Sequence, residues 1–80
     1  MFLSDLAPGQ RAVVQGLVAA TADIHASVLR RLADLGFIAG EPLQLMRRGP
    51  GGREPLAVQI GETMFALRLV EARCIQVELQ

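Results

Sequence analysis

The sequence predicts a mostly β protein: a small barrel of about five antiparallel strands with one inserted α-helix at about residues 23–35. Two patterns carry this prediction. Apolar residues alternate with polar or small residues in several short segments after Gly40, and only one segment repeats them at helical spacing. A chain of 80 residues, 51% of them hydrophobic, can bury one compact core. We therefore expect a single domain over residues 1–80.

The first strand is predicted at Gln10–Val18, with Gly16 marking a bend or a bulge. Before it, Ser4 is expected to cap one helical turn that closes at Pro8-Gly9. After it, the blander stretch Val18–Ala22 leaves the entry into the helix open.

The one clear helix has two competing N-cap residues, Thr21 and Asp23. We expect Gly36 to end the helix in the left-handed conformation, and Phe37 to fold back onto the helix as the hydrophobic contact of that cap. The residues expected to share the buried face are Ile24, Val28, Leu32 and Leu35, with Leu29 beside them.

Everything after Gly40 is predicted to be antiparallel sheet. The loop Gly49–Glu54 is expected to be mobile and without regular structure, Gly61-Glu62 to form a two-residue hairpin turn, and Val70–Cys74 to hold no more than one helical turn. The predicted strands are Pro42–Arg48, the segment with Leu56, Val58 and Ile60, the segment with Phe65, Leu67 and Leu69, and the segment with Ile75, Val77 and Leu79.

The composition excludes several classes of function. Eight arginines balance eight acidic residues, and three phenylalanines are the only aromatic side chains, so a nucleic-acid partner is not expected. The lone Cys74 allows no internal disulfide and is expected to be structural. The N-terminus does not resemble a signal peptide, and no apolar run approaches the ~20 residues that span a bilayer, so we expect a cytoplasmic protein without membrane insertion.

Catalysis is not expected either. The sequence has one histidine, one cysteine and two serines, and its carboxylates are scattered singly. Enzymes need a nucleophile with its base, or paired acids, held together in a pocket. The sequence therefore predicts a non-enzymatic protein.

His25 is the weak candidate for a metal ligand. His25 and Cys74 are the only imidazole and thiol side chains in the sequence, and they are not spaced to chelate one ion. A half-exposed histidine on the helix flank is the simpler interpretation. We expect no required cofactor, and at most weak Fe²⁺ or Zn²⁺ binding that bridges two chains in a homo-oligomer.

The candidate partner-binding surface is defined by arginine and methionine side chains. Arg47, Arg48 and Arg53 form the only local basic cluster; they are either solvated loop charges or a site for an acidic or phosphate-bearing partner. Met46 and Met64 are predicted to be partly exposed, although each also suits a barrel corner as core filler. The residues selected for partner binding are Arg30, Arg31, Met46, Arg47, Arg48 and Met64.

The sequence also resembles a known family. The run Leu29–Gly40 is similar to the helix-to-strand segment of the FeoA family, and Leu3–Gln10 to its opening segment. The further matching pieces are Pro55–Ile60, Ala66-Leu67-Arg68, Ala72 and Ile75-Gln76-Val77. The resemblance implies an SH3-like β-barrel and a non-enzymatic accessory protein of ferrous iron uptake. It also implies a partner, the cytoplasmic GTPase-containing part of the FeoB permease.

One alternative stays open. The same segments resemble the C-terminal SH3-like module of iron- and manganese-dependent repressors, which implies a metal-sensing regulatory module. Those repressors carry a DNA-binding winged helix first, whereas this sequence starts at Met1 without one. The accessory protein is therefore the favoured interpretation.

Overall fold

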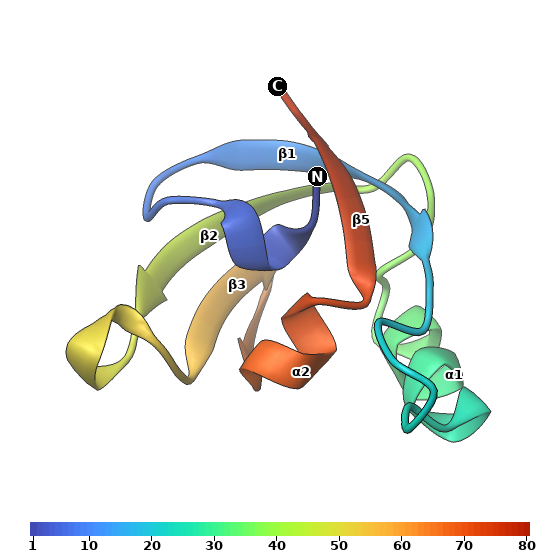
Figure 1. Cartoon of the computed structure of the whole chain (residues 1–80). Coiled ribbons are helices and arrows are strands. Elements are labelled where there is room, and N and C mark those ends of the chain that lie inside the picture. Colours follow the sequence, from blue (N-terminus) through green and yellow to red (C-terminus); the bar gives the residue numbers. More distant parts are fainter.

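The computed structural model describes residues 1–80, and its five strands form one antiparallel sheet in the order β4-β3-β2-β1-β5. Figure 1 shows the sheet strongly curved, with α1 set to one side of it and α2 next to the start of β5. The elements in chain order are η1 (Leu3–Asp5), β1 (Arg11–Leu17), α1 (Ala26–Asp34), β2 (Pro42–Arg48), η2 (Pro50–Gly52), β3 (Leu56–Ile60), β4 (Thr63–Leu67), α2 (Leu69–Ala72) and β5 (Ile75–Leu79).

The strand predictions hold with small changes at the ends. β2 has the predicted bounds, and β1 is one residue shorter at each end than expected. The β3–β4 hairpin turns through Gly61 and Glu62, because Ile60 pairs with Thr63. Gly61 has a φ of 59°, the left-handed value that a two-residue hairpin needs at its first position. The register of β1 shifts between Val14 and Gly16, as a bulge at this glycine predicts.

The predicted start of the helix is wrong. α1 begins at Ala26 rather than near residue 23, and neither Thr21 nor Asp23 caps it. The Ile24 amide donates to the Thr21 carbonyl at 3.2 Å, so residues 21–24 form a turn of their own. Threonine and aspartate side chains favour turns as well as helix N-caps, and here they lie in a turn before the helix. His25 is left at the N-cap position without a side-chain bond.

The predicted end of the helix is confirmed. Gly36 has a φ of 113°. The Phe37 amide donates to the Leu32 carbonyl at 3.1 Å, and the Gly36 amide donates to Ala33 at 3.0 Å. These two bonds are those of a Schellman cap, and Phe37 and Leu32 are both fully buried.

Leu69 does not continue the fourth strand as predicted. It begins α2, because two carboxylates bind the backbone amides at this point. Glu71 accepts from the Arg68 amide at 2.8 Å, and Glu54 accepts from the Leu69 amide at 2.7 Å. At the N-terminus, Asp5 rather than Ser4 satisfies the first turn, accepting from the Phe2 amide at 2.9 Å.

The Gly49–Glu54 loop also differs from its prediction, since it contains the short turn η2. Gly51 and Gly52 adopt φ values of 74° and 73°, and the Gly52 amide donates to the Gly49 carbonyl at 3.0 Å. A methyl group on Gly49 would collide with the Glu54 carbonyl, so only glycine fits where the loop closes on itself.

The core lies inside the curve of the sheet. Phe37 is part of it, and the partly buried Phe65 packs against Phe37 with the two ring centroids 5.7 Å apart. Cys74, which is expected from the sequence to be structural, is buried, and its thiol donates to the Val70 carbonyl at 3.4 Å. The buried apolar residues are Leu3, Leu6, Ala12, Val14, Leu32, Phe37, Leu43, Leu45, Leu56, Val58, Ile60, Leu67, Ala72, Cys74, Ile75 and Val77.

Candidate partner-docking surface

A bulge in β2 determines where the two neighbouring arginines lie. Leu45 pairs with Val58, but the next paired residue is Arg47, opposite Ala57, so Met46 is an extra residue. Strict alternation from Leu45 would place Arg47 inside and Arg48 outside. The extra residue reverses this arrangement. Arg47 joins the outer face of the sheet, and Arg48 pairs with the buried residue Leu56.

Arg48 is a structural residue rather than a solvated loop charge. One guanidinium nitrogen, Nη2, donates to the Ser4 carbonyl at 2.7 Å and to the Leu6 carbonyl at 2.9 Å. The other nitrogen, Nη1, reaches the Gly52 carbonyl at 3.4 Å. The side chain therefore joins the N-terminal turn to the end of β2 and to η2. Its guanidinium is thus engaged by backbone carbonyls within the chain, and a role of Arg48 in partner binding stays a prediction.

The Arg47 side chain makes no hydrogen bond or ion pair, and it lines an open groove of about 680 Å³. We call this the outer groove. Ala57 and Ala66, which pair across β3 and β4, are small enough to leave it hollow. Its other lining residues are Arg48, Gly49, Pro50, Pro55, Met64 and Phe65.

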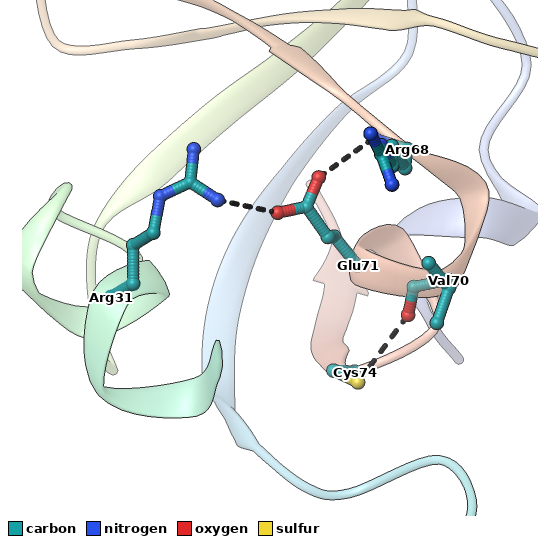
Figure 2. Close-up of polar contacts among 5 residues, drawn as sticks. All are labelled: Arg31, Arg68, Val70, Glu71 and Cys74. Atoms are coloured by element: carbon teal, nitrogen blue, oxygen red, sulfur yellow. Dashed lines mark hydrogen bonds and ion pairs between the residues drawn. The ribbon is translucent and has the colours of Figure 1, made fainter. Parts of the chain in front are cut away.

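Arg31 has a partner within the chain. Its Nη1 lies 3.0 Å from Oε2 of Glu71, which is the only ion pair in the structure. Figure 2 shows the Glu71 carboxylate between this guanidinium and the Arg68 amide. The Glu71 side chain is only 11% exposed, whereas that of Arg31 is 67% exposed. The pair links α1 to α2, and it joins residues 40 positions apart that no local pattern relates.

A second groove, of about 470 Å³, lies between α1, the end of β4 and α2. We call it the helix groove. Its apolar lining comes from Ile24, Val28, Ala66 and Val70, and its polar lining from Arg31, Arg68 and Glu71. Ala66 lines both grooves, so β4 runs between them.

The predicted partner-binding residues do not form one patch. Arg47, Arg48 and Met64 meet in the outer groove, while Arg31 lines the helix groove. Met64 is 54% exposed. The remaining two, Arg30 and Met46, are exposed but line neither groove. Sequence reasoning missed the two alanines and Pro55, since only the pairing of the strands brings them together.

His25 lies at the N-cap of α1 and is exposed. Its predicted position on a flank of the helix is wrong, because the helix begins one residue later. No three histidine, cysteine, aspartate or glutamate side chains lie close enough to hold a metal ion. None of the helices is both long and apolar enough to cross a membrane.

Comparison with known proteins identifies the fold and the family. The family model described as the FeoA domain matches residues 1–79. The chain belongs to the FeoA family. Members of this family are non-enzymatic accessory proteins associated with ferrous iron transport. A search of curated proteins found no match.

Solved structures of FeoA proteins agree with this assignment. The zinc complex of Stenotrophomonas maltophilia FeoA is 42% identical, covers 98% of this chain and 89% of its own, and superposes with a TM-score of 0.85. That protein is described as an SH3 domain protein and a candidate activating factor for bacterial ferrous iron transport. FeoA from Chlorobium tepidum is 35% identical, with coverage of 99% and 70% and a TM-score of 0.83. The predicted SH3-like fold is thus confirmed.

The resemblance to metal-dependent repressors is also visible in the fold. A manganese-dependent transcriptional repressor in complex with manganese superposes with a TM-score of 0.81 over 100% of this chain and 36% of its own, at 20% identity. At that identity the likeness shows the shared fold alone.

Proposed function

We propose that this chain, one domain over residues 1–80, is a cytoplasmic accessory protein of ferrous iron uptake. It binds the cytoplasmic GTPase-containing part of a FeoB-type permease and supports or regulates transport without catalysing a reaction. The observation that carries the proposal is the match to the FeoA domain over residues 1–79. The 42% identity to a candidate transport-activating factor supports it.

The surface of the molecule supports a binding role. The two grooves are open and partly apolar, and arginines without ion-pair partners line both of them. Arginine and methionine are enriched at protein interfaces, where other charges are depleted. Arg47 and Met64 supply these two side chains in the outer groove.

The test is a calorimetric titration of the purified chain against the soluble cytoplasmic domain of the FeoB permease from the same genome. We expect saturable binding with one site per chain, and no GTP hydrolysis by the chain alone. Arg47→Glu should weaken binding, more strongly at low salt, where exposed charges are least screened. The matched control is Arg11→Glu, the same charge change at an exposed residue of β1 outside both grooves. Absence of binding in low salt would refute the proposal.

The alternative function is a metal-sensing regulatory module. The observation that favours it is the zinc complex of the Stenotrophomonas protein, which is 42% identical to this chain. Under this alternative, Mn²⁺, Fe²⁺ or Zn²⁺ would bind the isolated chain tightly and alter its association with a separate DNA-binding protein. Under the favoured proposal, metal binding is weak and His25 contributes only between two chains. Titration of each metal into a monomeric sample separates the two.

A further inference from the structure

The outer edge of β4 has open backbone groups. In an antiparallel ladder, hydrogen-bonded pairs alternate with non-bonded pairs. A two-residue turn closes on the bonded pair Ile60–Thr63, so the next bonded pair is Val58–Phe65. The amides and carbonyls of Met64 and Ala66 therefore point away from β3. No hydrogen bond from any turn, loop or side chain reaches them, and β4 is the last strand of the sheet.

This edge runs between the two grooves. Ala66 lines both, with Met64 in the outer groove and Val70 in the helix groove. Side chains of a strand point alternately to opposite faces. An extended segment that paired with β4 would therefore run between the outer groove and the helix groove, with its side chains within reach of both. Edge-strand recognition of this kind takes affinity from backbone bonds and specificity from the pockets on either side.

The charges at the edge indicate what the segment should carry. Glu71, which is bound by Arg31, is the one carboxylate that lines either groove, since Glu54 and the turn residue Glu62 line neither. Arg47 and Arg68 line the two grooves with exposed guanidinium groups that make no ion pair. The net charge of the side chains that line the two grooves is therefore positive, which favours an occupant that carries carboxylates.

We propose that β4 takes up an extended acidic segment of the partner protein as an added sixth strand. Aliphatic side chains of the segment enter the helix groove, and its carboxylates face Arg47. This inference rests on the proposed function for the identity of the partner, and it locates the docking surface. A second copy of this chain fits less well, because pairing two β4 edges would bring identical arginines together.

The direct test follows the amide protons of Met64 and Ala66 by hydrogen exchange in NMR. Two probes are used: the permease's soluble cytoplasmic domain, and the peptide acetyl-Glu-Val-Glu-Val-Glu-amide with its Lys-Val-Lys-Val-Lys counterpart as control. We expect both the domain and the acidic peptide to slow exchange of these two amides by about tenfold or more, since each gains a hydrogen-bond partner. The lysine peptide should leave them unchanged.

A proline substitution tests the backbone contact. Ala66→Pro removes the edge amide, which an edge strand tolerates because that amide makes no ladder bond. We expect it to weaken binding of the permease domain by about tenfold or more, whereas Ala66→Val keeps the amide and should change binding less. If Ala66→Pro fails to fold, the proposal is tested by the exchange of the wild-type amides and by the binding of the permease domain to the Arg47→Glu/Arg68→Glu variant, which should be weaker.

The outcomes separate this inference from the proposed function. If the permease domain binds while the two amides stay unprotected and Ala66→Pro binds normally, the edge proposal is wrong and the proposed function stands. If only the acidic peptide protects them, the edge proposal stands and the proposed partner is wrong. If neither probe protects them, the edge proposal is wrong. Protection that appears with rising protein concentration alone, together with a dimer in sedimentation, would identify a second copy as the occupant and overturn the proposal.

Discussion

Replacing Arg48 by methionine should destabilise the protein strongly, although the residue lies among exposed charges near a loop. Its Nη2 donates to the carbonyls of Ser4 and Leu6 at 2.7 and 2.9 Å, and Leu6 is buried. Methionine keeps much of the side-chain volume but leaves both carbonyls without this donor. Hydrogen bonds to a charged group contribute about 1.5–3 kcal/mol each.

Arg48 is only partly buried, and its two bonds share one nitrogen. We therefore expect Arg48→Met to lower the free energy of unfolding by about 2–4 kcal/mol rather than by the full sum of the two contributions. A domain of this size loses about 4–8 °C in Tm for each kcal/mol, so the predicted fall is roughly 10–30 °C. Arg48→Lys keeps the charge but not the planar guanidinium group, so its stability should lie between that of the wild type and that of Arg48→Met. Urea unfolding followed by circular dichroism measures the free energy of unfolding.

Arg47→Met is the matched control, since it makes the same chemical change at the next residue. The Arg47 side chain has no hydrogen bond, and its substitution should alter the free energy of unfolding by no more than about 0.5 kcal/mol. Equal stability of the two variants would show that Arg48 does not hold the N-terminal turn, and the reasoning from the β2 bulge would fail with it.

Three further predictions follow from the helix ends and the metal ligands. Gly36→Val should cost about 1–3 kcal/mol of unfolding free energy, because Gly36 has a φ of 113°. Gly16→Ala should be tolerated, since this glycine of the β1 bulge has no positive φ and open space around it; equal Tm values of the two variants would contradict this. Glu71→Ala should cost about 1–3 kcal/mol in the same unfolding assay, since it removes the partner of Arg31 and the acceptor of a backbone amide, and an unchanged urea midpoint would speak against that role. Any tight Fe²⁺ or Zn²⁺ binding should accompany dimerisation and disappear in His25→Ala; stoichiometric, sub-micromolar binding by a monomer in calorimetry would exclude an inter-chain site.

The sequence predicts most of the fold because its signals are local. The end of α1 is an example: the left-handed glycine and the apolar residue after it appear together in the sequence, and Gly36 and Phe37 form the expected cap. The hairpin at Gly61-Glu62 is another. The errors arise where a distant or competing bond determines the outcome. Leu69 leaves the strand pattern because Glu54, 15 residues away, binds its amide.

Less of the candidate site could be predicted. Arginine and methionine are reasonable residues to select for a docking surface, and Arg47 and Met64 do meet in one groove. The sequence pattern could not separate Arg47 from Arg48, because the bulge that distinguishes them leaves no glycine or proline as a signal. It also gave no sign of Ala57 and Ala66, whose small size matters only once β3 and β4 are paired.

The extra residue at Met46 also affects how relatives should be compared with this chain. The inward leucine at position 45 and the anchoring arginine at position 48 are separated by two residues, not by one. An alignment that shifts these strands by a single position would match the anchoring arginine of one protein to the groove arginine of another. Relatives are therefore better compared by counting from the bulge than by maximising arginine matches. A relative without the extra residue should place its anchoring cation one position earlier, directly after a single intervening residue.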